Sequence, residues 1–401
     1  MVEYQPLTTR HPFSIKNSSI SSSFQILFHL HFPQCWQQPS FFFIVQIFQH
    51  PMSISTCLFV CFSQQILLFI FRSYYLFCAV LFVFSVTKPR SLIIKSALLF
   101  TPQTCARSLR HSKDETFRKD FLPNSRLFLQ KDDLNMSEWN RLSHFTGPFG
   151  FMQNEYKVKL IPKPKEPLLH PKAGGDGCVT CAVVGTGGIL YGSKMGEEID
   201  AHDYVFRMNG AVIKGFEEDV GRRTSVYVHT SYAIVYSVKK LAQHGFTSAP
   251  HDEGIKYVMI PEGMRDHYWI EALLKGNRVP QKYYPTPFNQ SNFYVLHPDF
   301  LRYLRNRFIM SETLKTKHWW LFRPTNGAFT LLLALHTCDT VDAYGFMTND
   351  YAKYSNYYVE KFQKTNVIFY INHDLNVEKD LWHRLHDSKI IKLAKSNGVM
   401  Y

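Results

Sequence analysis

Short apolar runs alternate with longer amphipathic segments from residue 181 onward. The runs predict buried strands, and the segments between them predict helices. Elements of these lengths in alternation predict an α/β fold with a doubly wound, mostly parallel sheet covered on both faces. Predicted strands cover 181–184, 204–206, 226–228, 256–260, 293–296 and 367–371, with another ending at 344–346. Predicted helices cover 190–199, 233–244, 264–275, 297–308 and 376–385, with an apolar helix after 327.

The N-terminal part of the chain has a different pattern. Residues 66–86 read ILLFIFRSYYLFCAVLFVFSV, a run of 21 residues whose one charge is Arg72. About 20 apolar residues span a bilayer, and no polar face is present for a soluble helix, so we expect a membrane anchor. Residues 1–65 show no periodicity, and we assign no function to them. We expect 87–150 to be a stem and lead-in, and 151–401 to be one folded domain.

The chain of 401 residues carries a net charge of +13, but its basic residues form no run and no patch interleaved with aromatics. Nucleic-acid binding is therefore not predicted. A surface that attracts anionic small molecules or glycoproteins fits the charge better.

A glycine turn follows the first predicted strand, with Gly185, Gly187 and Gly188. Glycines allow close approach of the backbone, and a helix N-terminus after the turn would offer N–H groups to an anion. Asp203 stands near the position of a ribose-binding acid, which would suit a nucleotide-dependent oxidoreductase. Leu190 occupies the place of the third glycine, however, and a tight turn without any nucleotide is also compatible with the spacing.

Four stretches together resemble the motifs of the animal sialyltransferases. Residues 178–211 (CVTCAVVGTGGILYGSKMGEEIDAHDYVFRMNGA) resemble the large sialylmotif, and 323–329 (RPTNGAF) the small one. Residues 354–360 (YSNYYVE) resemble the third motif, and His373 with Glu378 matches the very small motif. The chain is most similar to the N-acetylgalactosaminide α-2,6-sialyltransferases. The resemblance implies a Rossmann-like, GT-A-like single catalytic domain behind an N-terminal anchor.

The resemblance also implies a reaction. CMP-sialic acid would donate sialic acid to O6 of GalNAc on O-linked glycoproteins, by direct displacement with inversion. His373 would be the general base, because a neutral imidazole accepts a proton near pH 7. Glu378 supports its motif, and the chain contains no Asp-x-Asp, so neither a metal nor another cofactor is expected. The expected donor-binding residues are Thr186, Gly187, Gly188, Asn209, Thr325, Asn326, Gly327 and Tyr357.

Beyond the anchor the chain has four cysteines. The resemblance pairs Cys181 with Cys338 and leaves Cys105 for Cys178. An even number of cysteines suits an oxidising compartment, and sequons begin at Asn135 and Asn289. The basic residues after the anchor would favour a cytoplasmic C-terminus. The motifs imply the opposite: a single-pass type II protein of the Golgi membrane with its catalytic domain in the lumen.

Three positions depart from the family pattern: Thr186 and Tyr191 where Asn is usual, and Asn326 where Ser or Thr is usual. These departures concern donor affinity more than the fold. They leave a catalytically weak glycan-binding relative as an alternative, with the oxidoreductase as a more remote one.

Overall fold

The computed structural model describes residues 105–130, 133, 135–152, 167–360 and 364–394. The expected anchor at 66–86 and the N-terminal tail lie outside these residues. Within them, no helix has both the length and the apolarity needed to cross a membrane.

One parallel sheet organises the described part of the chain, with the strand order β5-β4-β3-β2-β1-β6-β7. From β1 the chain moves outward to β5 and then returns to the other side of β1, so the predicted doubly wound fold is confirmed. The strands are β1 (Thr180–Val184), β2 (Tyr204–Met208), β3 (Val226–His229), β4 (Lys256–Met259), β5 (Phe293–Val295), β6 (Thr340–Tyr344) and β7 (Ile391–Leu393).

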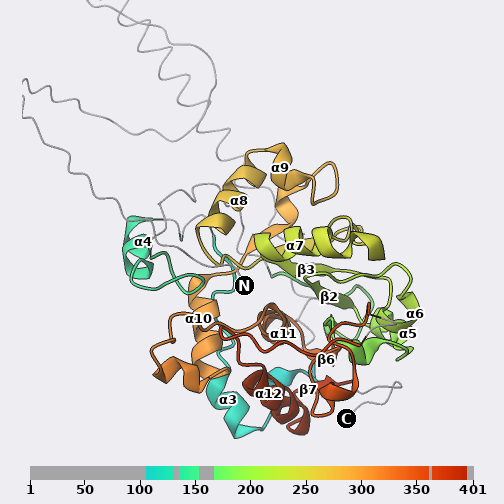
Figure 1. Cartoon of the computed structure of the whole chain (residues 1–401). Coiled ribbons are helices and arrows are strands. Elements are labelled where there is room, and N and C mark those ends of the chain that lie inside the picture. Colours follow the sequence, from blue (N-terminus) through green and yellow to red (C-terminus); the bar gives the residue numbers. More distant parts are fainter. Residues whose placement is uncertain (1–104, 131–132, 134, 153–166, 361–363, 395–401) are drawn as a thin grey trace, which may run out of the picture. The chain divides into compact units, whose positions relative to one another are not determined.

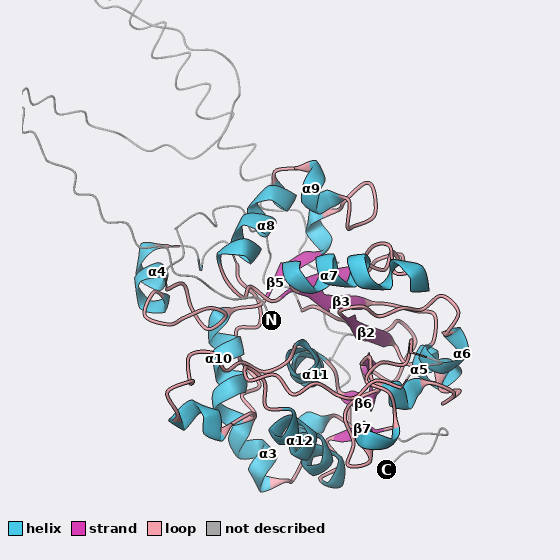
Figure 2. Cartoon of the chain, viewed as in Figure 1, coloured by secondary structure: helices cyan, strands magenta, loops and turns pink. Residues whose placement is uncertain are grey.

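Helices cover both faces of the sheet (Figures 1 and 2). Successive side chains of a strand point to opposite faces. In β1, Ala182 and Val184 therefore join one core, while Cys181 and Val183 join the other. The first core contains residues of α5 (Gly196–Ala201), α7 (Ser231–Leu241) and α8 (Met264–Leu274). The second contains residues of α10 (Pro298–Arg307), α11 (Asn326–Thr337) and α12 (Leu375–Asp387).

Shorter elements complete the body. The helices are α3 (Glu115–Asp120), α4 (Met136–Leu142), α6 (Glu217–Val220) and α9 (Arg278–Gln281). The 3₁₀ turns include η1 (Leu109–His111), η3 (Gly188–Leu190), η4 (Ala242–His244), η5 (Gln290–Asn292), η6 (Glu312–Lys315) and η7 (Tyr351–Lys353). Phe117, Phe121 and Phe149 are buried in the second core. The stretch expected to be stem thus adds helices and core residues, and the folded body begins before residue 151.

Two predicted elements are wrong. The helix expected at 190–199 begins only at Gly196, because Gly192 and Lys194 have φ values of 72° and 59°, which a right-handed helix excludes. Residues 367–371 form no strand. Side chains 368–371 are 49–66% exposed, and the edge position beside β6 belongs to β7.

Candidate active site

A pocket of about 320 Å³ opens at the carboxyl ends of β1, β2 and β6. It lies where the strand order reverses, between β1 and β6, the usual ligand site of an open α/β sheet. Its lining includes every site residue predicted from the sequence: Thr186, Gly187, Gly188, Asn209, Thr325, Asn326, Gly327, Tyr357, His373 and Glu378.

The glycine turn packs its backbone against two other loops. The N–H of Gly187 donates to the Gly345 carbonyl at 3.0 Å, and that of Gly188 donates to the Ser355 carbonyl at 3.1 Å. A Cβ atom at Gly188 would overlap the Ser355 carbonyl oxygen. Because both N–H groups already have partners, Gly187 and Gly188 shape the pocket wall and do not offer these donors to a ligand.

The N-terminus of α11 faces the pocket through Thr325, Asn326 and Gly327. The Thr325 hydroxyl accepts from the Ala328 N–H at 3.0 Å and caps the helix. First-turn N–H groups have no partner within their helix, so this end suits an anion. Because α5 begins only at Gly196, the helix N-terminus that lines the pocket belongs to α11 and not to the helix expected directly after the glycine turn.

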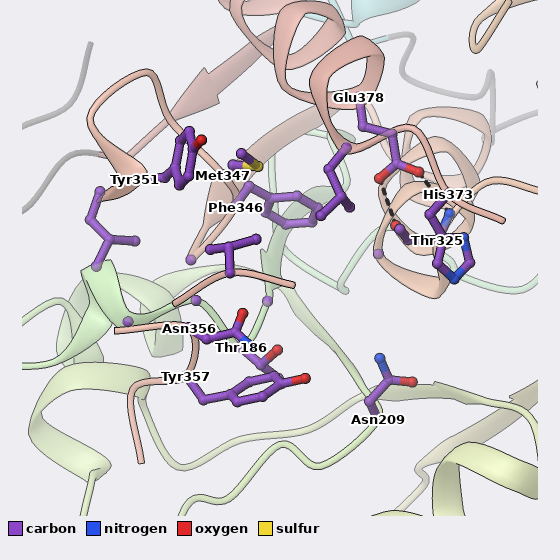
Figure 3. Close-up of a pocket in the computed structure, with 18 of the residues that line it drawn as sticks. Thr186, Asn209, Thr325, Phe346, Met347, Tyr351, Asn356, Tyr357, His373 and Glu378 are labelled. Atoms are coloured by element: carbon purple, nitrogen blue, oxygen red, sulfur yellow. Dashed lines mark hydrogen bonds between the residues drawn. The ribbon is translucent and has the colours of Figure 1, made fainter. Parts of the chain in front are cut away.

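Glu378 holds this turn from the first residues of α12 (Figure 3). Its carboxylate accepts from the Thr325 N–H at 2.7 Å and from the Thr325 hydroxyl at 2.6 Å. Burial raises the pKa of Glu378 to about 7, although both Thr325 hydrogen bonds oppose the shift. Glu378 therefore joins α12 to α11 and titrates near neutral pH.

His373 lies just before α12, and its ring is oriented by the backbone of the preceding motif. Nδ1 is 2.8 Å from the Arg323 carbonyl oxygen, which can only accept, so the neutral ring carries its proton on Nδ1. Burial, and then the positive charge of Arg323, lower the pKa of His373 to about 4. The ring is therefore neutral at pH 7, and Nε2, which lies 3.4 Å from the Asn372 amide nitrogen, carries the lone pair that can accept a proton.

Asn209 follows β2 in the left-handed conformation, with φ of 51°. Its side-chain oxygen accepts from the Asn326 amide at 2.8 Å, which leaves its own NH₂ group to face a ligand. The departure at Asn326 thus has a structural consequence, since an amide at that position orients Asn209. Figure 3 shows Asn209, Tyr357 and His373 around one open space.

The third motif is held by Glu360, whose carboxylate accepts from the Ser355 hydroxyl at 2.6 Å and the Tyr357 N–H at 3.1 Å. Tyr357 is 45% exposed and lines the pocket. The carbonyl of Thr186 accepts from the Tyr358 N–H at 3.2 Å, so the glycine turn and this motif are joined.

Two histidines outside the pocket lining, His336 and His202, have structural surroundings. His336 is buried in α11, with Nδ1 2.7 Å from the Leu332 carbonyl and Nε2 3.1 Å from the Tyr303 hydroxyl. His202 lies 3.3 Å from Asp342. Among the residues described, no cluster of three or more His, Cys, Asp or Glu is placed to hold a metal ion.

Sequence reasoning missed several residues of the lining, including Arg323, Phe346, Met347, Tyr351, Tyr370 and Trp382. Arg323 is the first residue of the stretch that resembles the small sialylmotif, but the resemblance gave no role to its side chain. Of the lining residues that the structure describes, Arg323 alone is a lysine or arginine. Its guanidinium pairs with Glu262, and its carbonyl holds His373.

Comparison with known proteins gives consistent matches. The model of glycosyltransferase family 29 (sialyltransferase) matches residues 128–390. Alpha-N-acetylgalactosaminide alpha-2,6-sialyltransferase 1 of Gallus gallus is 46% identical over 311 residues, 72% of this chain and 55% of the relative. The Homo sapiens protein of that name is 45% identical over 316 residues, 74% of this chain and 52% of the relative. The chain thus spans about half the length of these curated relatives.

A solved structure with the same fold is a mammalian sialyltransferase in complex with Gal-beta-1-3GalNAc-ortho-nitrophenol. It is 24% identical, with a TM-score of 0.53, over 73% of this chain and 99% of that chain. At this identity the likeness establishes the fold alone.

Proposed function

This chain belongs to glycosyltransferase family 29, the sialyltransferases, and from that membership we propose that it transfers sialic acid from CMP-sialic acid to O6 of GalNAc on O-linked glycoproteins. The 40–46% identity to proteins named for this activity supports the choice of acceptor. The oxidoreductase alternative has no support from the family.

One observation carries the proposed chemistry: a neutral imidazole, fixed by the Arg323 carbonyl, in the same pocket as the N-terminus of α11. The helix end and the Asn209 amide bind the CMP phosphate and nucleotide. His373 Nε2 takes the proton of the acceptor hydroxyl. The acceptor oxygen then bonds to the anomeric carbon as the bond to phosphate breaks, with inversion and release of CMP. The proposal includes no metal or other cofactor.

The low pKa of His373 in the free pocket is compatible with this role. A general base works best when its pKa lies near the operating pH. CMP-sialic acid brings a phosphate and a carboxylate, and nearby negative charges raise the pKa of a histidine. We therefore expect the bound donor to make His373 a stronger base than it is in the free pocket.

We also propose that residues 66–86 anchor the chain in the Golgi membrane as a single-pass type II protein, with the catalytic domain in the lumen. The two disulfides, Cys105–Cys178 and Cys181–Cys338, support an oxidising compartment.

The deciding experiment incubates the full chain in detergent with CMP-sialic acid and a GalNAc-Ser/Thr glycopeptide, followed by linkage analysis. The expected product carries sialic acid α-2,6-linked to GalNAc. Binding of CMP without any transfer would support the weak glycan-binding relative, and another linkage would refute the acceptor assignment.

A further inference from the structure

A half-buried ion pair next to the base has no part in the chemistry above. It joins Arg323 to Glu262, and the two side chains are only 20% and 19% exposed. Glu262 lies in the loop between β4 and α8, far from Arg323 in the sequence. Keeping two charges this close to a pocket is costly unless they are well paired, so the pair invites a functional explanation.

The pair belongs to a row of polar side chains. Arg323 Nη1 lies 3.3 Å from the Asn326 side-chain oxygen, and the Asn326 amide donates to Asn209 at 2.8 Å. The row Glu262–Arg323–Asn326–Asn209 therefore runs along the carboxyl edge of the sheet, from β2 towards β4. Asn209, Asn326 and Arg323 line the pocket, and Glu262 lies beyond its lining.

The topology divides this edge between two substrates. The glycine turn, the α11 N-terminus and Tyr357 surround the β1–β6 switch point, which is the donor side. The acceptor must approach His373 from elsewhere. The row leads from the base towards the ends of β3 and β4, where none of these donor groups lies.

Resting on the proposed function, we infer that the Glu262–Arg323 pair is the recognition element for the acceptor sugar. Glu262 Oε1 is buried against Arg323, so Oε2 is the oxygen left to accept hydrogen bonds from sugar hydroxyls or the acetamido N–H. The guanidinium would donate to sugar oxygens. The backbone of Arg323 meanwhile holds His373, so one residue links acceptor recognition to the base. A carboxylate at this position also disfavours the alternative ligand, the carboxylate of the donor sugar, by like-charge repulsion.

An aromatic surface follows the row outward. Tyr232 and Tyr236 of α7 are 53% and 48% exposed, and their rings stack with centroids 5.6 Å apart. Arg265, three residues after Glu262, lies over the Tyr232 ring at 5.0 Å. Rings with a polar tip and an apolar face suit the rest of a glycopeptide.

The test uses the full chain in detergent with Glu262→Gln and Arg323→Lys. Binding of a GalNAc-Ser glycopeptide is followed by ligand-observed NMR in the presence of CMP, so it does not require turnover. We expect the Kd and the KM for the glycopeptide to rise roughly tenfold or more in each variant, the scale of a lost charge-assisted hydrogen bond. In Glu262→Gln, which changes a residue outside the pocket lining, the Kd for CMP should change less than twofold, and it also reports folding.

Two further variants keep the test decisive. The double variant Glu262→Gln with Arg323→Gln leaves neither charge of the pair behind. It is used in place of a single variant if that variant does not fold. Glu312→Gln with Lys315→Gln removes a pair that is 82% and 75% exposed on η6, and it should change neither constant.

Four outcomes overturn the inference. Unchanged glycopeptide binding, or equal weakening of glycopeptide and CMP, would make the pair structural. Weaker binding of CMP-sialic acid with unchanged binding of CMP would assign the pair to the donor carboxylate. A parent protein that does not bind the glycopeptide would refute the proposed function, and this inference with it; variants unaffected beside a binding parent refute the inference alone.

Discussion

The two ends of β1 have opposite properties. At the amino end Cys181 is bonded to Cys338, and the Val179 and Asp339 backbones are joined by an N–H···O=C bond of 2.8 Å. At the carboxyl end β1 and β6 separate after the contact between Gly187 and Gly345, and the pocket opens between their loops. One end is closed covalently, and the other is held by neutral backbone contacts.

Helix α11 connects these ends. It begins at the pocket, where Thr325 caps it, and it ends at Thr337, directly before Cys338. Its residues from Ala328 to His336 are buried. A helix fixed at one end and packed along its length can present an open N-terminus at the other. Stability is therefore concentrated at the amino end of β1, and chemistry at its carboxyl end.

Removal of the Cys181–Cys338 bond should have the largest effect, and it should be on stability. The bond closes a sequence separation of 157 residues, which in the chain-entropy model stabilises by about 5 kcal/mol. We expect Cys181→Ser with Cys338→Ser to lower the free energy of unfolding by about that amount, measured by urea titration without reductant. Protein that remains folded should bind CMP normally; a loss of CMP affinity without a loss of stability would reverse the comparison.

His373→Ala should show the complementary behaviour. A positioned base contributes about 10²–10⁴-fold to rate, so turnover should fall by that factor while stability and CMP affinity change little. His251→Ala, an exposed histidine, serves as the control. Substantial turnover in the His373 variant would mean that another group takes the proton.

The pH dependence of the parent sharpens this prediction. Protonation removes the base, so kcat/KM for the donor should fall as the pH drops through about 4, the pKa of His373 in the free pocket. The acid limb of kcat should lie at higher pH, because the bound donor is anionic. Coincident limbs, measured by initial rates across pH, would contradict the electrostatic argument.

The pH dependence of stability should report the contact that Glu378 makes between α12 and α11 at the carboxyl end. Its folded pKa of about 7 exceeds the ordinary value of 4.5, so its contribution to stability is complete below 4.5 and is lost as the pH rises through 7. Glu378→Gln imitates the protonated form. We expect the unfolding free energy of the variant to lack this part of the decline, whose slope is at most about 1.4 kcal/mol per pH unit.

Urea titrations of the parent and the Gln variant between pH 5 and 8 provide the measurement. Glu312→Gln, at an 82% exposed side chain, should follow the parent. Parallel pH profiles for the parent and Glu378→Gln would show that the carboxyl group does not change its charge in this range.

The sequence predicted the elements whose signals are local. The apolar run at 181–184 lies in β1, and the ten predicted site residues share one pocket. Residues 186–188 and Asn209 follow β1 and β2, and the other residues lie in the loop after β6 or at the starts of α11 and α12. The failures came from positions that local periodicity does not report. Lys194 adopts a positive φ, and 367–371 is apolar but exposed. The contacts of Glu378 with Thr325 and of Arg323 with Glu262 join distant segments, so only the folded chain reveals them.

Asn209 gives the smallest expected effect and the finest separation of stability from chemistry. Loss of one hydrogen bond from its amide should weaken CMP binding by at least about 1 kcal/mol, measured by calorimetry. Because Asn209 has φ of 51°, Asn209→Ala adds backbone strain of about 1–2 kcal/mol, whereas Asn209→Gly does not. Both variants should therefore bind CMP equally weakly. Only Asn209→Ala should also have a lower free energy of unfolding, because its side chain disfavours the left-handed conformation. An unchanged CMP affinity in Asn209→Gly, with the fold intact, would remove Asn209 from the donor site and leave it as a turn residue oriented by Asn326.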